Sequence, residues 1–448
     1  RGLGDVYKRQ KKNPLFLSAS FILLIIKNKS PMKASIYNSY IPITEATTLV
    51  YNSFGNDYLL VDVNNAKKIE QQIFSELPDR LLKELKNKRF VLPKEVDESS
   101  LLLFDRIKKY ETDSHYNLIL NPTLNCNLSC WYCYETKTPS RMSPTMVESI
   151  KKFISNTLKE GTPIEIFDIS FFGGEPLINF NDVALPIMQI TKEICQNRGI
   201  IYRFDYTTNS YLINDRMIEI MKEYQPINFQ ITLDGCEEEH NSTRFLKNGK
   251  GTYRKVIESI KSLVKNDFDV TVRLNYTHKN IVGMIKIVDD LKELSEYKNV
   301  SIAFERVWQD YREGNIEEEV ETVKEKFKSV GFDIGELKYS TSPKWCYGNR
   351  KNTAVLNYNG DIFKCTARDF KRENREGYIN EDGSIIWDEE RVENRYRALF
   401  KNKMCYSCRI APICTEICSQ KAVEEGNKLK CVYNEDRKNA VSYTHLRA

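Results

Sequence analysis

Histidine is scarce in this chain of 448 residues, which contains four: His115, His240, His278 and His445. None of them is spaced to complete a metal site with the cysteines near residue 130, so a zinc ion held there would lack its fourth ligand. The sequence also has no low-complexity stretch and no long internal repeat, which argues against a solenoid. The length and the ordinary hydrophobic content are those of a soluble protein with two or three domains.

An excess of positive charge is missing too, once the two ends are set aside. Residues 1–10 (RGLGDVYKRQ) and 441–448 (VSYTHLRA) can be encoded by one oligonucleotide read in its two orientations, and it resembles a sequencing-library adapter. We therefore expect both tails to be foreign to the native chain. Residues 1–31 hold seven Lys/Arg and one Asp, and the last eight residues hold Arg447, so the net charge of +5 becomes −2 for residues 32–440. This argues against a nucleic-acid partner.

No apolar run is long enough to cross a bilayer comfortably. The run at Pro14–Ile26 (PLFLSASFILLII) follows Lys11 and Lys12 in the manner of a short signal peptide, but it lies between adapter-like sequence and Met32, a plausible true start. We expect residues 1–31 to be adapter-derived and upstream sequence rather than a targeting signal. The expected protein is cytoplasmic, with no membrane partner.

Twelve cysteines are distributed unevenly, with three in residues 126–133 and seven in residues 346–431. Disulfide frameworks belong to small secreted domains, whereas tight clusters in a large cytosolic chain indicate metal ligation. The remaining two, Cys195 and Cys236, have no partner spacing. Cys195 falls in a helical pattern and is expected in the core, and we expect no role for Cys236.

The first expected domain, residues 33–110, contains no cysteine. Strand-like runs lie at residues 37–43, 47–54, 58–63 and 89–92, a turn at residues 55–57, and helical patterns at residues 66–77, 80–87 and 100–109. Short strands with three helices are compatible with a winged-helix-like module.

From Tyr116 onward, strand-like and helical runs alternate. The expected strands are 116–120, 164–172, 202–208, 228–233, 269–276 and 300–306, and the expected helices lie near 143–159, 182–197, 214–224, 251–265 and 283–296. Six strands with intervening helices predict an α/β fold with a parallel sheet, here a partial (β/α)6 TIM-like barrel over residues 116–310. Active sites in such folds lie at the C-terminal ends of the strands. Residues 311–345, with a charged helix, are expected to be a solvated linker before a cysteine-rich domain at residues 346–440.

Cys126, Cys130 and Cys133 form a C-x3-C-x2-C motif directly after the first barrel strand. Three thiolates within eight residues can hold three irons of a four-iron cluster and leave the fourth iron without a protein ligand. Such an open position is typical of a reactive metal site. The alternatives are an incomplete zinc site and buried free cysteines.

This motif, with Tyr132 before its last cysteine, resembles that of the radical S-adenosylmethionine (radical SAM) superfamily. A second motif agrees, because Gly173-Gly174-Glu175-Pro176 ends the second strand, where the superfamily has its GGEP motif. Two glycines allow the backbone to approach a ligand closely, and a carboxylate can receive an ammonium group. Further positions resemble cofactor-lining residues of the superfamily: Asn209, Asp234 and Arg244. The resemblance implies that a [4Fe-4S] cluster cleaves S-adenosylmethionine and that the 5′-deoxyadenosyl radical abstracts hydrogen from the substrate.

The C-terminal cysteines form a second pattern. They read Cys346-x13-Gly360-x4-Cys365, then Cys405-x2-Cys408-x5-Cys414-x3-Cys418, then Cys431. This resembles the SPASM domain; two zinc knuckles would need eight ligands rather than seven.

The SPASM resemblance implies two auxiliary [4Fe-4S] clusters, which divide the seven cysteines. One would be held fully by Cys405, Cys408, Cys414 and Cys431, and the other by Cys346, Cys365 and Cys418. The second would keep an open iron able to take a substrate thiolate. The alternatives are a non-cysteine ligand, a bound water or small thiol, and a role in electron transfer alone.

These resemblances imply a peptide maturase that forms a thioether or carbon–carbon cross-link in a ribosomally made precursor peptide. The 33–110 module resembles a RiPP recognition element, which would bind the leader peptide by strand addition; a lid or a dimerisation arm is the alternative. The expected electron donor is a flavodoxin or ferredoxin. A second candidate is an anaerobic sulfatase maturase, but those enzymes carry an acidic residue where this chain has Thr366. A third, from another class, is a metal-containing winged-helix regulator that binds DNA.

Overall fold

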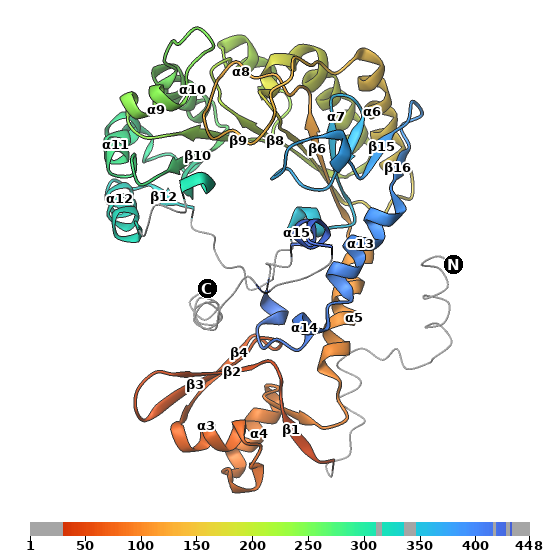
Figure 1. Ribbon diagram of the computed structural model, residues 1–448, viewed down its shortest axis with the longest axis vertical. Coiled ribbons are helices and arrows are strands. Elements are labelled where there is room, and N and C mark those ends of the chain that lie inside the picture. Colours follow the sequence, from red (N-terminus) through yellow and green to blue (C-terminus); the bar gives the residue numbers. More distant parts are fainter. Residues whose placement is uncertain (1–29, 311–315, 336–345, 415–417, 427–430, 432–448) are drawn as a thin grey trace.

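The computed structural model describes residues 30–310, 316–335, 346–414, 418–426 and 431 (Figure 1). Both expected adapter-like tails, the apolar run at residues 14–26 and His445 lie outside these residues. No helix within the described part of the chain is both long enough and apolar enough to cross a membrane.

The N-terminal module combines two small antiparallel sheets with three α-helices. Its strands β2, β3 and β4 (Asn38–Pro42, Thr47–Asn52, Asp57–Asp62) form an antiparallel sheet in that order, and β1 (Met32–Ala34) pairs with β5 (Val91–Pro93). The helices are α3 (Val63–Glu70), α4 (Asp79–Asn87) and α5 (Glu98–Glu111). The helix expected at residues 66–77 is shorter than predicted, because Gln72 takes a left-handed φ of 63° just after Glu70.

The barrel consists of strands that alternate with helices, as the sequence predicts. Its strands are β6 (His115–Asn121), β7 (Ile166–Phe171), β8 (Ile201–Thr208), β9 (Ile227–Leu233), β10 (Asp269–Tyr276) and β11 (Val300–Arg306). The covering helices are α6 (Pro144–Thr157), α7 (Leu185–Arg198), α8 (Asp215–Lys222), α9 (Glu237–Thr243), α10 (Tyr253–Lys265) and α11 (Ile285–Leu291). Each strand pairs in parallel with the next, so their C-terminal ends meet at one edge. Ser143 caps α6 by accepting a hydrogen bond from the Met146 backbone N–H at 3.1 Å.

The expected linker is wrong for residues 316–335, which belong to the barrel. Helix α12 (Glu317–Ser329) buries Val320, Val323 and Phe327 in the barrel core, and β12 (Asp333–Ile334) pairs in parallel with β11. The charged residues of this helix occupy its outer face, which is why the segment resembles a solvated linker in the sequence.

The C-terminal region continues the same sheet instead of starting a separate one. Strand β13 (Thr353–Asn357) pairs in parallel with β6, and β14, β15 and β16 (Asp361–Phe363, Gly377–Ile379, Ile385–Trp387) follow as an antiparallel meander. The resulting sheet of eleven strands runs from β12 to β16. Strands β12 and β16 form the two edges of this sheet and are not paired with each other, so the barrel is open, as expected for a partial barrel.

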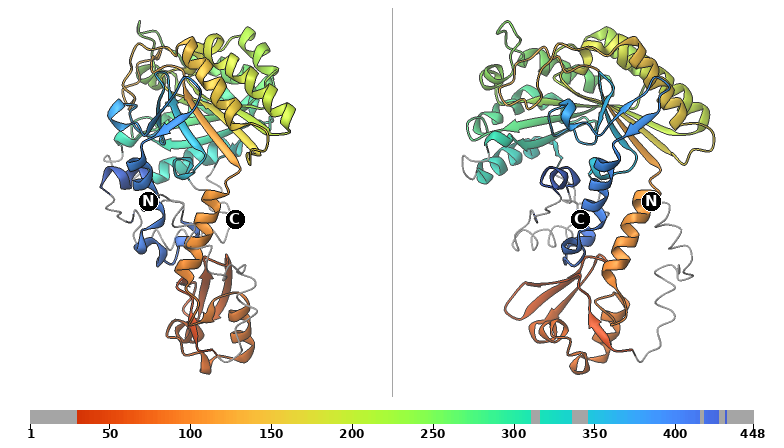
Figure 2. Two further views of the ribbon diagram at one scale, coloured as in Figure 1. Left: turned by 90° about the vertical axis from the view of Figure 1, so that its right-hand side faces the viewer. Right: turned by 45° about the vertical axis from the view of Figure 1, so that its right-hand side comes forward.

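Two helices connect the sheet to the N-terminal module. Helix α5 runs beside α13 (Glu389–Phe400; Figure 2). The ring centroids of Tyr110 and Phe400 lie 5.3 Å apart. Beyond α13, the short helix α14 (Lys403–Tyr406) brings the cysteine-rich segment back onto the module. There Tyr37 and Leu102 share a buried cluster with Tyr406.

Candidate functional site

The three cysteines of the first motif lie in the loop after β6, at the edge where the parallel strands end. Cys126 is buried and Cys133 is exposed. Burial, with a smaller contribution from the charge of Glu175, raises the pKa of the Cys126 thiol to about 12, and burial also raises the pKa of Cys133. The charge of Cys130 raises both values further. A cation is therefore needed to hold these sulfurs as thiolates.

Backbone and amide donors fix the buried sulfur. The Sγ atom of Cys126 accepts hydrogen bonds from the Leu128 backbone N–H at 3.4 Å and from Asn209 Nδ2 at 3.8 Å. The same Asn209 amide donates to Asn127 Oδ1 at 2.8 Å. Asn209 directly follows β8, so the end of β8 positions the cysteine loop that follows β6.

The two glycines after β7 let this strand approach the cysteine loop. Gly174 has a φ of 48°, and a Cβ placed on it would lie 2.3 Å from the Asn125 carbonyl oxygen. No other residue type fits this position. Its backbone N–H donates to Glu135 Oε2 at 2.7 Å, and burial raises the pKa of Glu135.

Glu175 is fully buried, and its carboxylate is engaged within the protein. Its oxygens accept hydrogen bonds from Thr208 Oγ1 at 2.7 Å, from the Asn209 backbone N–H at 2.8 Å and from the Leu177 backbone N–H at 3.0 Å. Burial raises the pKa of Glu175, and these bonds oppose that rise. In this structure Glu175 thus joins β7 to β8, and Pro176 begins the short helix that follows.

Tyr132, Asp234 and Arg244, which are far apart in the sequence, form one network. The Tyr132 hydroxyl donates to Asp234 Oδ1 at 2.6 Å and accepts from Arg244 Nη2 at 2.8 Å, and Arg244 Nε donates to Asp234. Asp234 is 1% exposed and Arg244 12%. Burial lowers the pKa of Arg244, but the charges of Tyr132 and Asp234 outweigh this, so Arg244 stays charged.

Sequence reasoning missed two members of this site. Asn275 Nδ2 donates to the Tyr132 hydroxyl at 3.0 Å, and Asn280 Nδ2 donates to the Asp234 carbonyl oxygen at 3.1 Å. Asn275 lies near the C-terminal end of β10, so a search for polar residues at strand ends would have found it.

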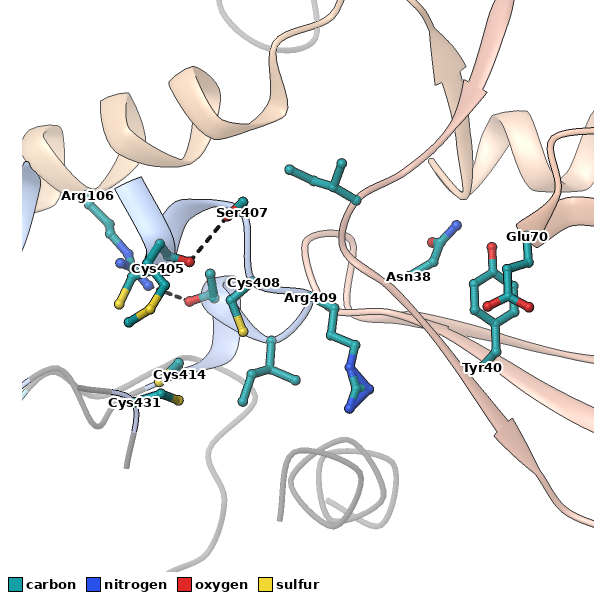
Figure 3. Close-up of a pocket in the computed structure, with 14 residues that line it drawn as sticks. Asn38, Tyr40, Glu70, Arg106, Cys405, Ser407, Cys408, Arg409, Cys414 and Cys431 are labelled. Carbon is teal, nitrogen blue, oxygen red and sulfur yellow. Dashed lines mark hydrogen bonds between the residues drawn. The ribbon is translucent and has the colours of Figure 1, made fainter. Parts of the chain in front are cut away.

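The seven C-terminal cysteines form two groups. Burial raises the pKa of Cys346, and the charges of Cys365 and Cys418 raise it further. The other four, Cys405, Cys408, Cys414 and Cys431, line one cavity of about 600 Å³ (Figure 3). The SPASM resemblance assigns these two groups to two auxiliary clusters, which stays a prediction. The described residues contain no group of three or more His, Cys, Asp or Glu side chains that is arranged to hold a metal ion.

Each spare cysteine is buried. Cys195 is 0% exposed and lies in the barrel core, as predicted. Cys236 precedes α9, and its thiol donates to Glu238 Oε2 at 3.1 Å.

Residues 120–297 match the sequence profile of the Radical SAM superfamily. This part of the chain is a radical SAM domain. The superfamily implies S-adenosylmethionine and a [4Fe-4S] cluster as cofactors.

Relatives of known sequence agree with this radical SAM assignment. An uncharacterised protein of Methanocaldococcus jannaschii is 29% identical over 258 residues, which cover 56% of this chain and 85% of that protein. The cysteine-type anaerobic sulfatase-maturating enzyme of Clostridium novyi is 28% identical over 36% of this chain and 44% of its own length. The subtilosin biosynthesis protein AlbA of Bacillus subtilis is 25% identical over 38% of this chain and 36% of its own length. The chain thus spans less than half the length of the latter two relatives.

Solved structures share the fold of this chain. The enzyme anSMEcpe, solved with bound AdoMet and the Kp18Cys peptide, superposes with a TM-score of 0.51 at 18% identity, over 67% of this chain and 88% of that one. Streptococcus suis SuiB superposes with a TM-score of 0.51 at 15% identity, over 89% of this chain and 99% of that one.

Proposed function

We propose that this radical SAM enzyme matures a ribosomally made precursor peptide by cross-linking it, through a thioether or a carbon–carbon bond. The observation that carries the proposal is the arrangement of three cysteine groups and a small sheet in one chain. One group lies at the strand ends of the barrel, and the four-cysteine cavity lies against the N-terminal module.

The residues at the strand ends fit the cofactors. Cys126, Cys130 and Cys133 would hold the [4Fe-4S] cluster. The amide of Asn209 already donates to the Cys126 sulfur, and Asn127 Nδ2 is buried without a hydrogen-bond partner among the described residues. Gly173 and Gly174 let the end of β7 pack closely against Asn121 and the cysteine loop, since neither position tolerates a Cβ.

S-adenosylmethionine bound there supplies the 5′-deoxyadenosyl radical that abstracts hydrogen from the substrate. The chain's own part is to orient it. The Tyr132–Asp234–Arg244 network offers a fixed hydroxyl and a fixed positive charge, while Glu175 and Pro176 fix the loop after β7. Because these groups are already hydrogen-bonded, they need little rearrangement when the cofactor binds.

The seven C-terminal cysteines would hold two auxiliary [4Fe-4S] clusters, as in a SPASM domain. Cys405, Cys408, Cys414 and Cys431 line one cavity and would supply four thiolates. Cys346, Cys365 and Cys418 would supply three, leaving one iron for a substrate thiolate. A flavodoxin or ferredoxin would supply the electrons.

The N-terminal module would bind the leader of the peptide, like a winged-helix recognition element. Strand β4 is an edge of its sheet, and it exposes two apolar side chains, Tyr58 (53%) and Leu60 (62%). An edge strand with exposed apolar residues is a template for an added strand. The Kp18Cys peptide bound to anSMEcpe supports a peptide substrate, and AlbA supports peptide biosynthesis.

Sulfatase maturation is the second candidate. Thr366 takes the place of the acidic residue expected in such enzymes, and it is held by Tyr347, whose hydroxyl lies 2.6 Å from Thr366 Oγ1. A threonine has no carboxylate to accept a substrate proton. This favours the cross-linking maturase.

The test is co-expression with short open reading frames found beside the gene, followed by mass spectrometry of the peptide. A cross-link removes two hydrogen atoms, whereas formylglycine gives an aldehyde that reacts with a hydrazide probe. Leu60→Glu should lower modification about tenfold or more through weaker leader binding, while uncoupled cleavage of S-adenosylmethionine stays unchanged. Val282→Glu, at a barrel residue that is 64% exposed, is the matched control. A hydrazide-reactive product would reject cross-linking in favour of the second candidate.

A further inference from the structure

Arg106 is a buried cation at the boundary between the N-terminal module and the four-cysteine cavity. It comes from α5, is 5% exposed and lines the cavity together with Cys405 and Cys408 (Figure 3). Its Nη2 donates to the Ala411 carbonyl oxygen, and its guanidinium carbon lies 5.3 Å from the centre of the Tyr406 ring. The segment that carries the cysteines therefore holds one side of this guanidinium.

The other side of the guanidinium is unsatisfied. Nη1 of Arg106 is buried and has no hydrogen-bond partner among the described residues. Within the same residues, no carboxylate lies within ion-pair distance of it. A buried donor and an uncompensated buried charge each cost free energy, so a native protein normally supplies a partner.

The neighbours of this guanidinium indicate an anionic partner rich in sulfur. Four cysteines line the cavity, and the charge of Arg106 opposes the rise in the pKa of Cys405 that burial causes. Four thiolates around a four-iron cluster give a net charge of about −2 in the oxidised state and about −3 in the reduced state. A hydrogen bond and a positive charge would stabilise the reduced state more, because it carries more negative charge.

We propose that Arg106 donates Nη1–H to the iron–sulfur cluster held by Cys405, Cys408, Cys414 and Cys431 and raises its reduction potential. This proposal rests on the proposed function, because that function places the cluster in the cavity. The cluster gains one electron from the external donor, and Arg106 keeps its proton throughout. The helix of the N-terminal module thus tunes a redox centre of the C-terminal region.

A redox titration followed by electron paramagnetic resonance tests this in the full chain. Replacing Cys126, Cys130 and Cys133 by Ala removes the cofactor-cleaving cluster, and two auxiliary signals remain. Arg106→Gln should make one auxiliary potential more negative by at least about 59 mV, which is tenfold in a one-electron equilibrium. Arg106→Lys keeps the charge and should restore most of the potential. Lys109→Gln removes the same charge from the exposed face of α5, where Lys109 pairs with Asp105 at 2.8 Å, and should leave both potentials unchanged.

A second readout does not depend on the stability of any variant. Protein labelled with 15N-arginine should show hyperfine coupling between an arginine nitrogen and one reduced auxiliary cluster, and Arg106→Lys should abolish it. Absence of the coupling in the unaltered chain, or equal potentials in Arg106→Gln and Lys109→Gln, would overturn the proposal. If Cys405→Ala with Cys408→Ala loses no iron, the cavity holds no cluster and the proposed function itself fails.

Discussion

Asp234 and Arg244 form a buried ion pair at the strand ends, and removing one charge from it should destabilise the barrel strongly. In Asp234→Asn the amide keeps the shape of the side chain, but Arg244 stays charged because a guanidinium is not deprotonated in proteins. Breaking a buried pair in this way costs about 3–5 kcal/mol, since one charge remains buried without compensation. The pair of Arg141 and Asp182 has side chains that are 64% and 59% exposed, so Asp182→Asn should cost about 0–1 kcal/mol.

Urea unfolding of the metal-free protein, followed by far-UV circular dichroism, measures both variants. With a slope of about 3 kcal/mol per molar urea, Asp234→Asn should lower the midpoint of the barrel transition by about 1 to 1.7 M. The double variant Asp234→Asn with Arg244→Met should recover part of this loss, because it removes the uncompensated charge. If Asp234→Asn lowers the midpoint no more than Asp182→Asn does, the buried pair does not stabilise the site and the reasoning fails.

Three further predictions follow from the same structure. Gly174→Ala should abolish iron binding by the first cysteine group, because its Cβ would lie 2.3 Å from the Asn125 carbonyl oxygen. The control Gly199→Ala, at a φ of 66° with open space around it, should lower the free energy of unfolding by only about 1 kcal/mol and keep the iron. His240 is fully buried, and burial lowers its pKa to about 3. Below pH 6.5 the unfolded chain therefore takes up a proton at this histidine that the folded chain does not, and the free energy of unfolding should fall by about 2 kcal/mol from pH 7 to pH 5. His240→Gln should remove this pH dependence. Protein purified without oxygen should contain about twelve iron atoms for three four-iron clusters, and stoichiometric zinc with little iron would reject the proposed function.

The strands of the barrel could be predicted from the sequence because local patterns decide them. Every expected barrel strand lies within about two residues of an observed one, and the helices that cover them alternate as predicted. Helix α12 was predicted as part of a solvated linker, and this error also has a local cause. Its charged residues dominate the composition, although Val320, Val323 and Phe327 already mark one apolar face.

The site could be predicted only as far as motifs reach. Tyr132 and the glycines after β7 belong to recognisable motifs, and parallel strands bring their C-terminal ends to one edge. Asn275 and Glu135 contact the site through hydrogen bonds that no motif encodes. Likewise, the SPASM resemblance assigns the seven C-terminal cysteines to two groups, but the cavity that four of them line also depends on residues from the N-terminal module.

The contact between the module and the cysteine-rich segment joins residues that are more than three hundred positions apart. The Tyr37 hydroxyl donates to the Tyr406 carbonyl oxygen at 2.8 Å, and Ser53 Oγ donates to the Arg409 carbonyl oxygen at 2.5 Å. Deleting the module would therefore remove the partners that satisfy the backbone beside Cys405 and Cys408, in addition to any peptide-binding edge. Loss of peptide modification in such a deletion would not distinguish leader binding from damage to the cavity. A substitution on β4, such as Leu60→Glu, lies on the edge strand and leaves these contacts in place, so it separates the two causes.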